Sequence, residues 1–182
     1  MKRLDVLLQR IRVRRVRPMI AAGARVLDIG CADGVLYREA TPLAWYVGID
    51  PDVSEATPLG NGRFIRDVFP TSSLDAKERF DVIAAIAVLE HVPSEAQRAF
   101  AAACATHTVP GGRVIITVPS PLVDSILAVL KRGAILDGMK DEQHYGFDPA
   151  STTALFEPHG FRLERHTRFE LGLNHLFVFQ RT

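Results

Sequence analysis

The sequence has little of what marks secreted disulfide-rich, membrane-spanning or nucleic-acid-binding proteins. Only two of its 182 residues are cysteine, Cys31 and Cys104, too few for a disulfide framework and typical of a reducing compartment. Lys and Arg number 22 against 21 Asp and Glu, so no overall basic field favours nucleic acid. The longest apolar stretches, such as residues 83–89, fall far short of the roughly 20 residues of a membrane helix. We therefore expect a soluble, cytoplasmic protein.

The composition is that of one folded domain. Apolar residues make up 47% and charged residues 24% of the chain, which excludes a disordered or low-complexity protein. A chain of this length buries about 70% of its extended surface on folding, enough for a core without disulfides or metals. We expect a basic N-terminal helix over residues 1–18 and a single domain over residues 19–182.

The N-terminal segment concentrates positive charge. Four apolar residues recur at helical spacing and predict an amphipathic helix that ends before Pro18: Leu4, Leu7, Leu8 and Ile11. Seven basic residues lie on the same segment: Lys2, Arg3, Arg10, Arg12, Arg14, Arg15 and Arg17. Two interpretations stay open, a solvated face whose arginine stems pack on the domain, or contact with an anionic surface or substrate. Nucleic acid remains an alternative only through this helix.

Short apolar runs alternate with helical stretches from residue 24 onward. Near-continuous β-branched runs are typical of strands buried on both faces, so we predict a parallel sheet covered by helices. The predicted strands are 25–29, 45–49, 63–66, 80–86, 113–118, 161–170 and 174–181, the last two antiparallel because their link is short. The predicted helices are 34–41, 94–107 with Ser94 as N-cap, 121–132, and 149–158 capped by Asp148 or Ser151. The fold class is a doubly wound α/β sheet with an antiparallel finish.

Acidic residues and glycines follow the first three predicted strands. Gly30 and Gly34 bracket a tight turn after Asp28, and the next two strands end on Asp50 and Asp67. In a doubly wound sheet ligands bind beyond the carboxyl ends of the strands, where a carboxylate can accept hydrogen bonds from ribose hydroxyls. Each residue alone also fits a structural role, a packing glycine or a turn aspartate. Together they predict a nucleoside-binding crevice.

The crevice is acidic where a phosphate would need positive groups. A dinucleotide fingerprint requires glycine at the positions of Ala32 and Val35, and the chain has no Gly-Lys-Ser or Gly-Lys-Thr phosphate loop. A nucleotide-dependent oxidoreductase is therefore disfavoured. A cofactor with a ribose, an adenine and a cationic amino-acid tail but no phosphate fits better, and S-adenosylmethionine has that composition.

Five segments resemble one family. Residues 26–34 resemble the first motif of class I S-adenosylmethionine-dependent methyltransferases, and residues 48–50 their second motif. Residues 80–83 and 88–92 are similar to the fourth-strand region of the small, single-domain type 11 members, and residues 110–114 to the turn into the fifth strand. The resemblance extends over residues 20–181. Ala32 departs from it, because the family usually has glycine there.

The resemblance implies a seven-stranded, mostly parallel sheet with a terminal antiparallel pair, and S-adenosylmethionine as cofactor. It places Asp28, Gly30 and Gly34 around the methionine moiety, Asp50 at the ribose and Asp67 at the adenine. It also gives Ile86 a backbone contact to the amino group. The adjoining residues assigned to the cofactor site are Cys31, Pro51 and Val68.

The residues that serve the methyl acceptor are less distinct. His91, His144 and Tyr145 are the candidate bases or acceptor contacts, with Glu90 a weaker one, and each also fits a structural role. No histidine spacing predicts a metal site. Residues 120–148 form the predicted acceptor-site or lid region, whose apolar helix either covers the sheet or faces the crevice.

The predicted reaction is an in-line methyl transfer to a small-molecule, lipid or glycan-type acceptor, with oxygen as the favoured atom. The alternative is a non-catalytic methyltransferase-like module that binds a nucleoside or acts as a scaffold. Such a module would lose the acids at the strand ends, whereas Asp28, Asp50 and Asp67 are all present. The sequence does not identify the acceptor or the oligomeric state.

Overall fold

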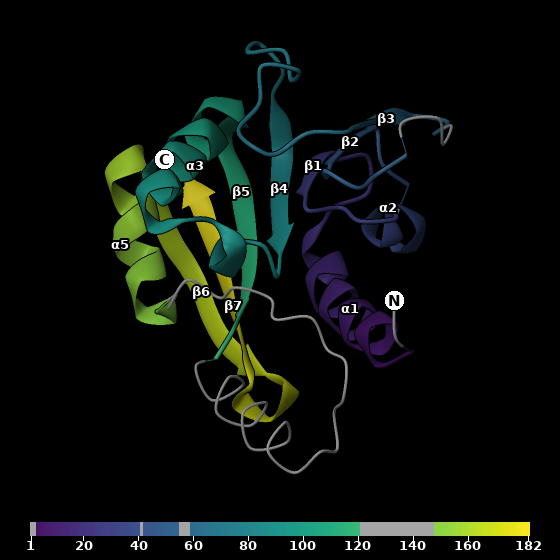
Figure 1. The fold of residues 1–182 in the computed structure, drawn as a ribbon. Helices are drawn as coiled ribbons and strands as arrows, with labels where there is room; N and C mark the ends of the chain where they lie inside the picture. Colours follow the sequence, from purple (N-terminus) through teal and green to yellow (C-terminus); the bar gives the residue numbers. More distant parts are fainter. Residues whose placement is uncertain (1–2, 41, 55–58, 121–147) are drawn as a thin grey trace.

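A computed structural model describes residues 3–40, 42–54, 59–120 and 148–182. Its centre is a seven-stranded sheet in the order β3-β2-β1-β4-β5-β7-β6 (Figure 1). The strands are β1 Arg25–Ile29, β2 Trp45–Ile49, β3 Gly62–Ile65, β4 Phe80–Ile86, β5 Thr108–Pro119, β6 Phe161–Phe169 and β7 Asn174–Arg181. The α-helices are α1 Arg3–Val16, α2 Val35–Glu39, α3 Ser94–His107 and α5 Thr152–Phe156. The predicted doubly wound sheet with its antiparallel finish is confirmed.

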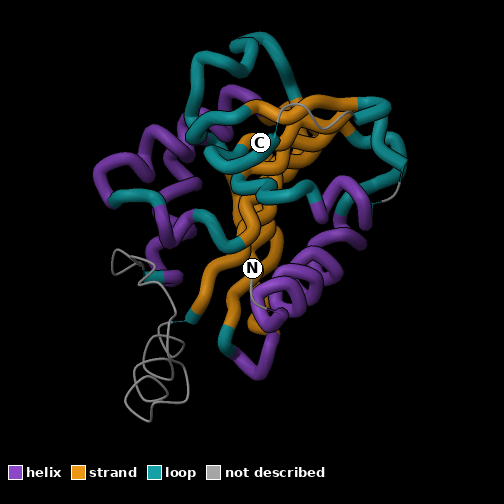
Figure 2. The backbone as a smooth tube through the Cα atoms, turned by 45° about the vertical axis from the view of Figure 1, so that its right-hand side comes forward, coloured by secondary structure: helices purple, strands orange, loops and turns teal. Residues whose placement is uncertain are grey.

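Helices cover both faces of the sheet, as the side view in Figure 2 shows. Val16 of α1 and Leu36 of α2 belong to the apolar core on one face. Phe100 of α3 and Phe156 of α5 belong to the core on the other face. Burial on both sides explains why the strands read as continuous apolar runs rather than alternating ones.

The parallel strands bring their carboxyl ends to one edge of the sheet. Ile29 of β1 lies opposite Ile49 of β2, and Ile49 lies opposite Ile65 of β3. β4 continues the parallel arrangement on the other side of β1. β7 then runs antiparallel between β5 and β6, so its first residue, Asn174, lies opposite Pro119 at this same edge.

The N-terminal helix forms as predicted, but its inner face is not the leucine-rich stripe. Leu7 is 55% exposed and Ile11 is 37% exposed. Val13 and Val16 are buried instead, at 3% and 0% exposure. The helix packs on the domain through these two valines, so the spacing of the leucines alone indicated the wrong side of the helix.

Of the two helix-cap predictions, one is wrong and one is confirmed. Pro93, not Ser94, is the N-cap of α3, and the Gln97 side chain donates to the Val92 carbonyl oxygen at 3.1 Å. Because Pro93 ends the preceding loop, the helix begins at Ser94. This is one residue earlier than it would begin with Ser94 as the cap. Asp148 does act as a cap, accepting from the Ala150 N–H at 2.9 Å. The helix predicted over 121–132 lies outside the described residues.

Within the described ranges, no helix is both long and apolar enough to span a bilayer.

Candidate functional site

The turn after β1 is tight and depends on two glycines. Gly30 and Gly34 have φ of +71° and +77°, in the left-handed region that favours glycine. A Cβ on Gly30 would lie 2.3 Å from Val88 Cγ2, and one on Gly34 would lie 2.7 Å from the Phe64 ring. The Gly30 N–H donates to the Ile49 carbonyl oxygen at 2.8 Å, which ties the turn to the end of β2. The two predicted glycine positions are therefore packed against the ends of β2, β3 and β4.

Asp28 lies beneath this turn and is 3% exposed. Its Oδ2 accepts a hydrogen bond from the Tyr46 hydroxyl at 2.7 Å. Burial raises the pKa of the Asp28 carboxyl to about 7, and the nearby Asp50 adds to the rise, whereas the Tyr46 hydrogen bond opposes it. A buried carboxylate with one protein partner is suited to a cationic ligand, whose charge would favour the ionised form.

Asp50, at the end of β2, holds the turn together. Its Oδ2 accepts from the Ala32 N–H and its Oδ1 from the Asp52 N–H, both at 2.9 Å. Ala32 itself has φ of +47°, so this residue keeps a backbone conformation that glycine would adopt more easily. A carboxylate has lone pairs for about four hydrogen bonds, and Asp50 therefore retains capacity for two ribose hydroxyls.

Asp67 follows β3 and is turned toward its own loop. Its carboxylate accepts from the Val68 N–H at 2.8 Å, from the Thr71 hydroxyl, and from the Ser73 hydroxyl at 3.1 Å. These hydrogen bonds, that of Thr71 first, hold the pKa of the Asp67 carboxyl below its usual range. Val68 beside it is 65% exposed.

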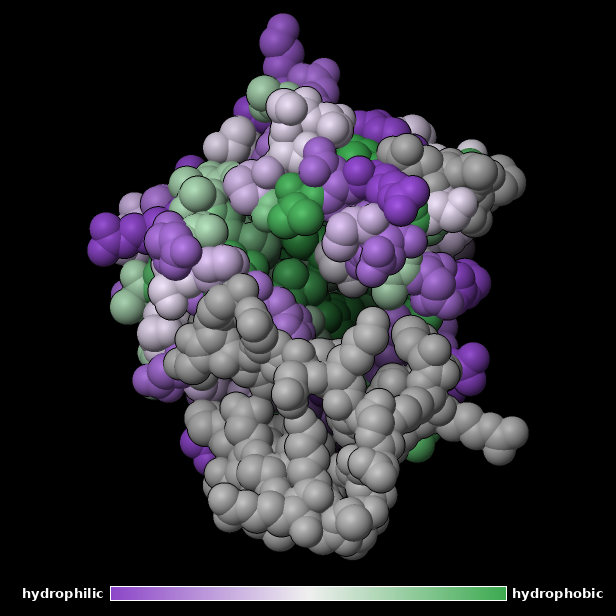
Figure 3. All heavy atoms as spheres, in the orientation of Figure 1, coloured by the Kyte–Doolittle hydropathy of each residue, from purple (hydrophilic) through white to green (hydrophobic). Residues whose placement is uncertain are grey.

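A small cavity lies between the carboxyl ends of the strands and α1. It measures about 30 Å³ and is lined by residues of α1, β1, the first turn, α2 and β4: Gln9, Val13, Asp28, Gly30, Cys31, Val35, Leu36 and Ile86. This space is large enough for one water molecule or a group of similar size. The space-filling view shows an apolar hollow in the same part of the molecule, where Figure 1 draws the ends of β1 and β4 (Figure 3).

The structure thus brings Asp28, Gly30, Gly34, Asp50 and Ile86 together. Two further predicted residues sit at the margin of this group. Cys31 borders the cavity but is buried, and burial raises the pKa of its thiol, so it is not a nucleophile. Pro51 is exposed, and its carbonyl oxygen accepts from Arg66 Nε at 3.1 Å.

His91 ends a short 3₁₀ helix, Leu89–His91, that follows β4. His91 is exposed, and its backbone N–H donates to the Val88 carbonyl oxygen at 2.9 Å. Glu90 beside it is buried at 3% exposure. His144 and Tyr145 lie outside the described residues. No group of three or more His, Cys, Asp or Glu that would hold a metal ion is found in the part of the chain that the structure describes.

Sequence reasoning missed several residues that shape this edge. Tyr46 falls within a predicted strand, and its hydroxyl reaches Asp28. Ala87 has φ of +56°, and its N–H donates to both the carbonyl oxygen and the hydroxyl of Thr117, at 2.9 and 3.1 Å. Gln9 borders the cavity from α1. Of these residues, only Ala87 could have been found from the sequence, because it directly follows a predicted strand.

The methyltransferase domain family matches residues 2–166 of this chain. The chain belongs to that family. The methyltransferase is 30% identical over 162 residues to the ubiquinone biosynthesis O-methyltransferase of Rhodopseudomonas palustris strain TIE-1, a match that covers 83% of this chain and 62% of the relative. It spans 39% to 62% of the length of the curated relatives from this species.

Solved structures agree with the fold. An S-adenosylmethionine-dependent methyltransferase from Mesorhizobium loti aligns with a TM-score of 0.69 at 18% identity, covering 92% of this chain and 96% of that one. The 1,6-didemethyltoxoflavin-N1-methyltransferase of Burkholderia thailandensis, with S-adenosylhomocysteine bound, aligns with a TM-score of 0.68 at 20% identity over 95% of this chain and 77% of that one. The prediction of a methyltransferase is confirmed by the family match, and its doubly wound fold by the solved structures.

Proposed function

We propose that this methyltransferase transfers the methyl group of S-adenosylmethionine to a hydroxyl oxygen of a small-molecule acceptor, whether free or carried on a lipid or glycan. The observation that carries this proposal is the small cavity lined by Asp28, Gly30 and Ile86, beside a turn that Asp50 holds through the Ala32 N–H. Similarity to relatives named ubiquinone biosynthesis O-methyltransferases supports oxygen as the accepting atom.

The residues present fit the cofactor. Asp28 and the small cavity beside it suit the amino group of its methionine moiety, and Ile86, which lines the same cavity, would contact that group through its backbone, as the resemblance implies. Asp50 suits the ribose hydroxyls. By the resemblance, Gly30 and Gly34 would lie along the methionine moiety and Asp67 at the adenine, with Cys31, Pro51 and Val68 as adjoining residues of the cofactor site.

When bound, S-adenosylmethionine supplies a methyl group made electrophilic by its sulfonium. The chain's own residues have to hold the acceptor oxygen in line with that methyl group, exclude water and receive the hydroxyl proton. In the described part, exposed His91 stands close to the end of β4 and is a candidate for the proton. His144 and Tyr145 remain candidates from the predicted acceptor region, residues 120–148.

The test is methyl transfer from isotopically labelled S-adenosylmethionine to a panel of hydroxylated aromatic compounds, with methyl ethers detected by mass spectrometry. We expect a labelled ether with the wild type. Asp50→Asn should weaken cofactor binding about 10–100-fold, because it loses charge-assisted hydrogen bonds worth about 1.5–3 kcal/mol. Tight S-adenosylhomocysteine binding without transfer to any hydroxyl, amine or carbon acceptor would instead support a non-catalytic module.

We also propose a peripheral contact of α1 with an anionic surface. Arg10 and Arg14 are exposed beside Leu7 and Ile11, so the outer side of the helix is both basic and apolar. The ion pair of Arg14 with Glu39, at 3.8 Å, leaves the arginine side chain 69% exposed and is worth little. A basic helix with exposed leucine and isoleucine suits membrane headgroups better than nucleic acid, because a membrane surface would also bury the apolar residues.

A further inference from the structure

A second and larger cavity lies between the end of α1 and the strands β5, β6 and β7. It measures about 290 Å³, just below the roughly 300–1,000 Å³ of pockets that hold drug-sized ligands. Charged and apolar side chains line this basic cleft: Arg15, Met19, Arg113, Glu164, Arg165 and Val178. The cleft therefore has room for a small organic molecule.

The strand register places the sheet residues of the basic cleft on one face. Arg165 of β6 lies opposite Val178 of β7, and Val178 lies opposite Ile115 of β5. Arg113 is two residues before Ile115, so its side chain is on the same face. Val178 and Ile115 belong to the core to which Val16 of α1 also belongs. The end of α1 and the outer strands are thus the two walls of one cleft.

The charges that line the basic cleft do not cancel. Arg113 donates from Nε and Nη2 to the two carboxylate oxygens of Glu164, at 2.8 and 2.9 Å, and this bidentate pair neutralises the acid. Arg15 and Arg165 are exposed, and neither forms a hydrogen bond or an ion pair with any residue that the structure describes. Three arginines against one glutamate leave the described lining with a formal charge of +2.

This lining defines the ligand that would match it. The guanidinium fork of arginine fits the oxygens of a carboxylate or a phosphate, and two arginines without a partner favour a ligand with two negative charges. A phosphate monoester carries about −1.5 to −2 charges at pH 7, whereas a single carboxylate carries one. Met19 and Val178 provide apolar surface for a small organic group on the ester.

The basic cleft is separate from the small cavity at Asp28. The two share no lining residue in the part of the chain that the structure describes. Arg113 lies opposite Val82 on β4, whereas Ile86, which lines the small cavity, lies opposite Thr117. Four residues of a strand span about 13 Å, so the cleft lies well back from the carboxyl edge of the sheet.

We propose that the basic cleft binds a phosphate monoester, either a small soluble molecule or the headgroup of a lipid. Arg15 and Arg165 contact the phosphate from opposite walls, and Arg113, held by Glu164, adds a third positive group. The site goes beyond the proposed methyl transfer, because it is independent of both the cofactor and the methyl acceptor.

The first experiment measures binding of phenyl phosphate, benzoate and benzyl alcohol to the full chain at pH 8, by ligand-observed NMR. These probes share a phenyl ring and carry two, one and no negative charges. We expect affinity to fall in that order, by about tenfold or more between the first and the last. Equal affinities, or no detectable binding of phenyl phosphate, would overturn the proposal.

Competition then separates the sources of the ligand and the two cavities. Displacement of phenyl phosphate by vesicles that contain phosphatidic acid supports the site with a lipid headgroup as its ligand, and no displacement supports it with a soluble ligand. S-adenosylhomocysteine should not displace the probe, because the cavities are separate. Displacement by S-adenosylhomocysteine would place the probe at the cofactor site and would overturn the proposal.

The second experiment uses charge variants with opposite expected signs. Arg15→Gln and Arg165→Gln should each weaken phenyl phosphate binding about tenfold. Glu164→Gln should strengthen it, because this change removes the negative charge and releases Arg113 for the ligand. We expect the first two variants to keep the unfolding midpoint of the wild type, since both arginines are exposed. Unchanged affinity in these two variants, or weaker binding by Glu164→Gln, would contradict the proposal.

Arg168→Gln is the matched control. Arg168 is also exposed on β6, but it is three residues from Arg165 and so lies on the opposite face of the sheet. This variant should bind phenyl phosphate like the wild type, although it changes the net charge by the same amount. An equal loss of affinity in Arg168→Gln and Arg165→Gln would show that only the overall charge matters, and would overturn the proposal.

Discussion

At the scale of single residues, the charge of Asp28 is the most consequential feature of the site. Its folded-state pKa of about 7 lies above the ordinary value of 3.8, because the side chain is buried. Between these two pH values the folded protein binds a proton that the unfolded chain has released. The free energy of unfolding therefore falls as the pH rises from about 4 to 7, by about 4 kcal/mol over the whole window.

This charge predicts pH-dependent cofactor binding. In the proposed site only ionised Asp28 would attract the ammonium of the cofactor. With a pKa of about 7, about one tenth of the molecules are ionised at pH 6 against about nine tenths at pH 8. Isothermal titration calorimetry should therefore show S-adenosylhomocysteine binding about tenfold tighter at pH 8 than at pH 6. Asp28→Asn should bind weakly at both values and lose the pH dependence of stability. An equally steep affinity profile in that variant would show that another group titrates.

Gly30 provides a second residue-scale prediction. Gly30→Ala would place a Cβ 2.3 Å from Val88 Cγ2 on a backbone with φ of +71°, so packing strain adds to the left-handed penalty. We expect a loss of about 2–4 kcal/mol in the free energy of unfolding, measured in urea.

Gly23→Ala is its control, since Gly23 also has positive φ, +78°, but nothing lies within 4 Å of its Cβ position. It should cost only about 1–2 kcal/mol. Equal costs for the two variants would mean that the contact with Val88 is not tight.

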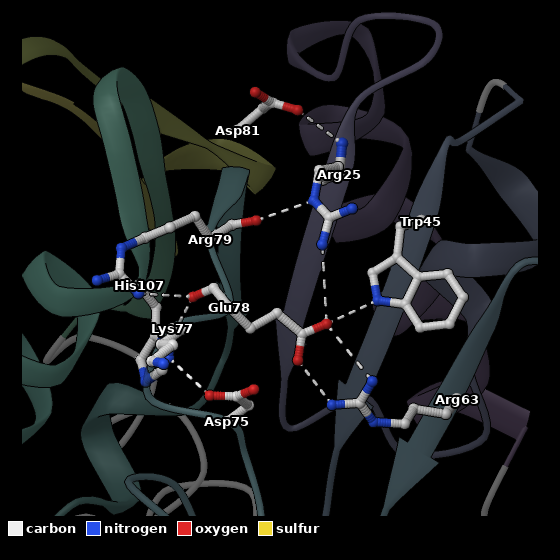
Figure 4. Close-up of polar contacts among 9 residues, drawn as sticks. All are labelled: Arg25, Trp45, Arg63, Asp75, Lys77, Glu78, Arg79, Asp81 and His107. Atoms are coloured by element: carbon white, nitrogen blue, oxygen red, sulfur yellow. Dashed lines mark hydrogen bonds and ion pairs between the residues drawn. The ribbon is translucent and has the colours of Figure 1, made fainter.

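At the scale of elements, the amino edge of the sheet is tied together by Glu78, which precedes β4 (Figure 4). Its carboxylate accepts from Trp45 Nε1 at 2.8 Å and from Arg63 at 2.6 Å. Arg25 lies 3.8 Å from the same carboxylate. One side chain thus links the starts of β1, β2 and β3 on the side opposite the cofactor site.

Glu78→Gln should lower the free energy of unfolding by about 1–2 kcal/mol, a value reduced by the partial exposure of both arginines. S-adenosylhomocysteine affinity should not change, because the residue is remote from the carboxyl edge. Glu95→Gln on exposed α3 surface should have an effect below about 0.5 kcal/mol. Chemical denaturation with and without ligand measures both quantities, and a change in ligand affinity would contradict this separation of roles.

Strands were easier to predict from the sequence than helix faces. β1, β2, β4 and β7 match their predicted bounds, because strands covered on both sides read as uninterrupted apolar runs. The inner face of α1 was not predictable in the same way. Gln9, Val13 and Val16 face inward while Leu7 is exposed, since the helix is placed by its contacts with the domain and not by its own hydrophobicity.

At the scale of the whole molecule, the charges balance but are unevenly placed. The net charge is +1, yet the N-terminal segment is strongly basic. We expect the full chain to sediment with phosphatidylglycerol vesicles at low salt and not with phosphatidylcholine vesicles. Replacing Leu7 and Ile11 with Gln should weaken this binding. As a control, replacing Arg38, which is exposed on α2, with Gln should leave the binding unchanged. Binding to both kinds of vesicle alike would contradict an electrostatic contact.

Most of the proposed cofactor site could be predicted from the sequence, because its residues lie at or just after the carboxyl ends of strands, and the topology alone brings those ends together. Tyr46 could not be predicted in this way, because its hydroxyl reaches Asp28 only once β2 is paired with β1.

The central claim is that the carboxyl edge binds S-adenosylmethionine through Asp28 and Asp50. Its most direct test is thermal unfolding with and without S-adenosylhomocysteine, for the wild type and Asp50→Ala. Ligand at 100 times its dissociation constant should stabilise the wild type by about 2.7 kcal/mol, or about 5–10 °C in the midpoint, and should leave the variant unshifted. A folded wild type whose midpoint does not move with either S-adenosylmethionine or S-adenosylhomocysteine would contradict the account.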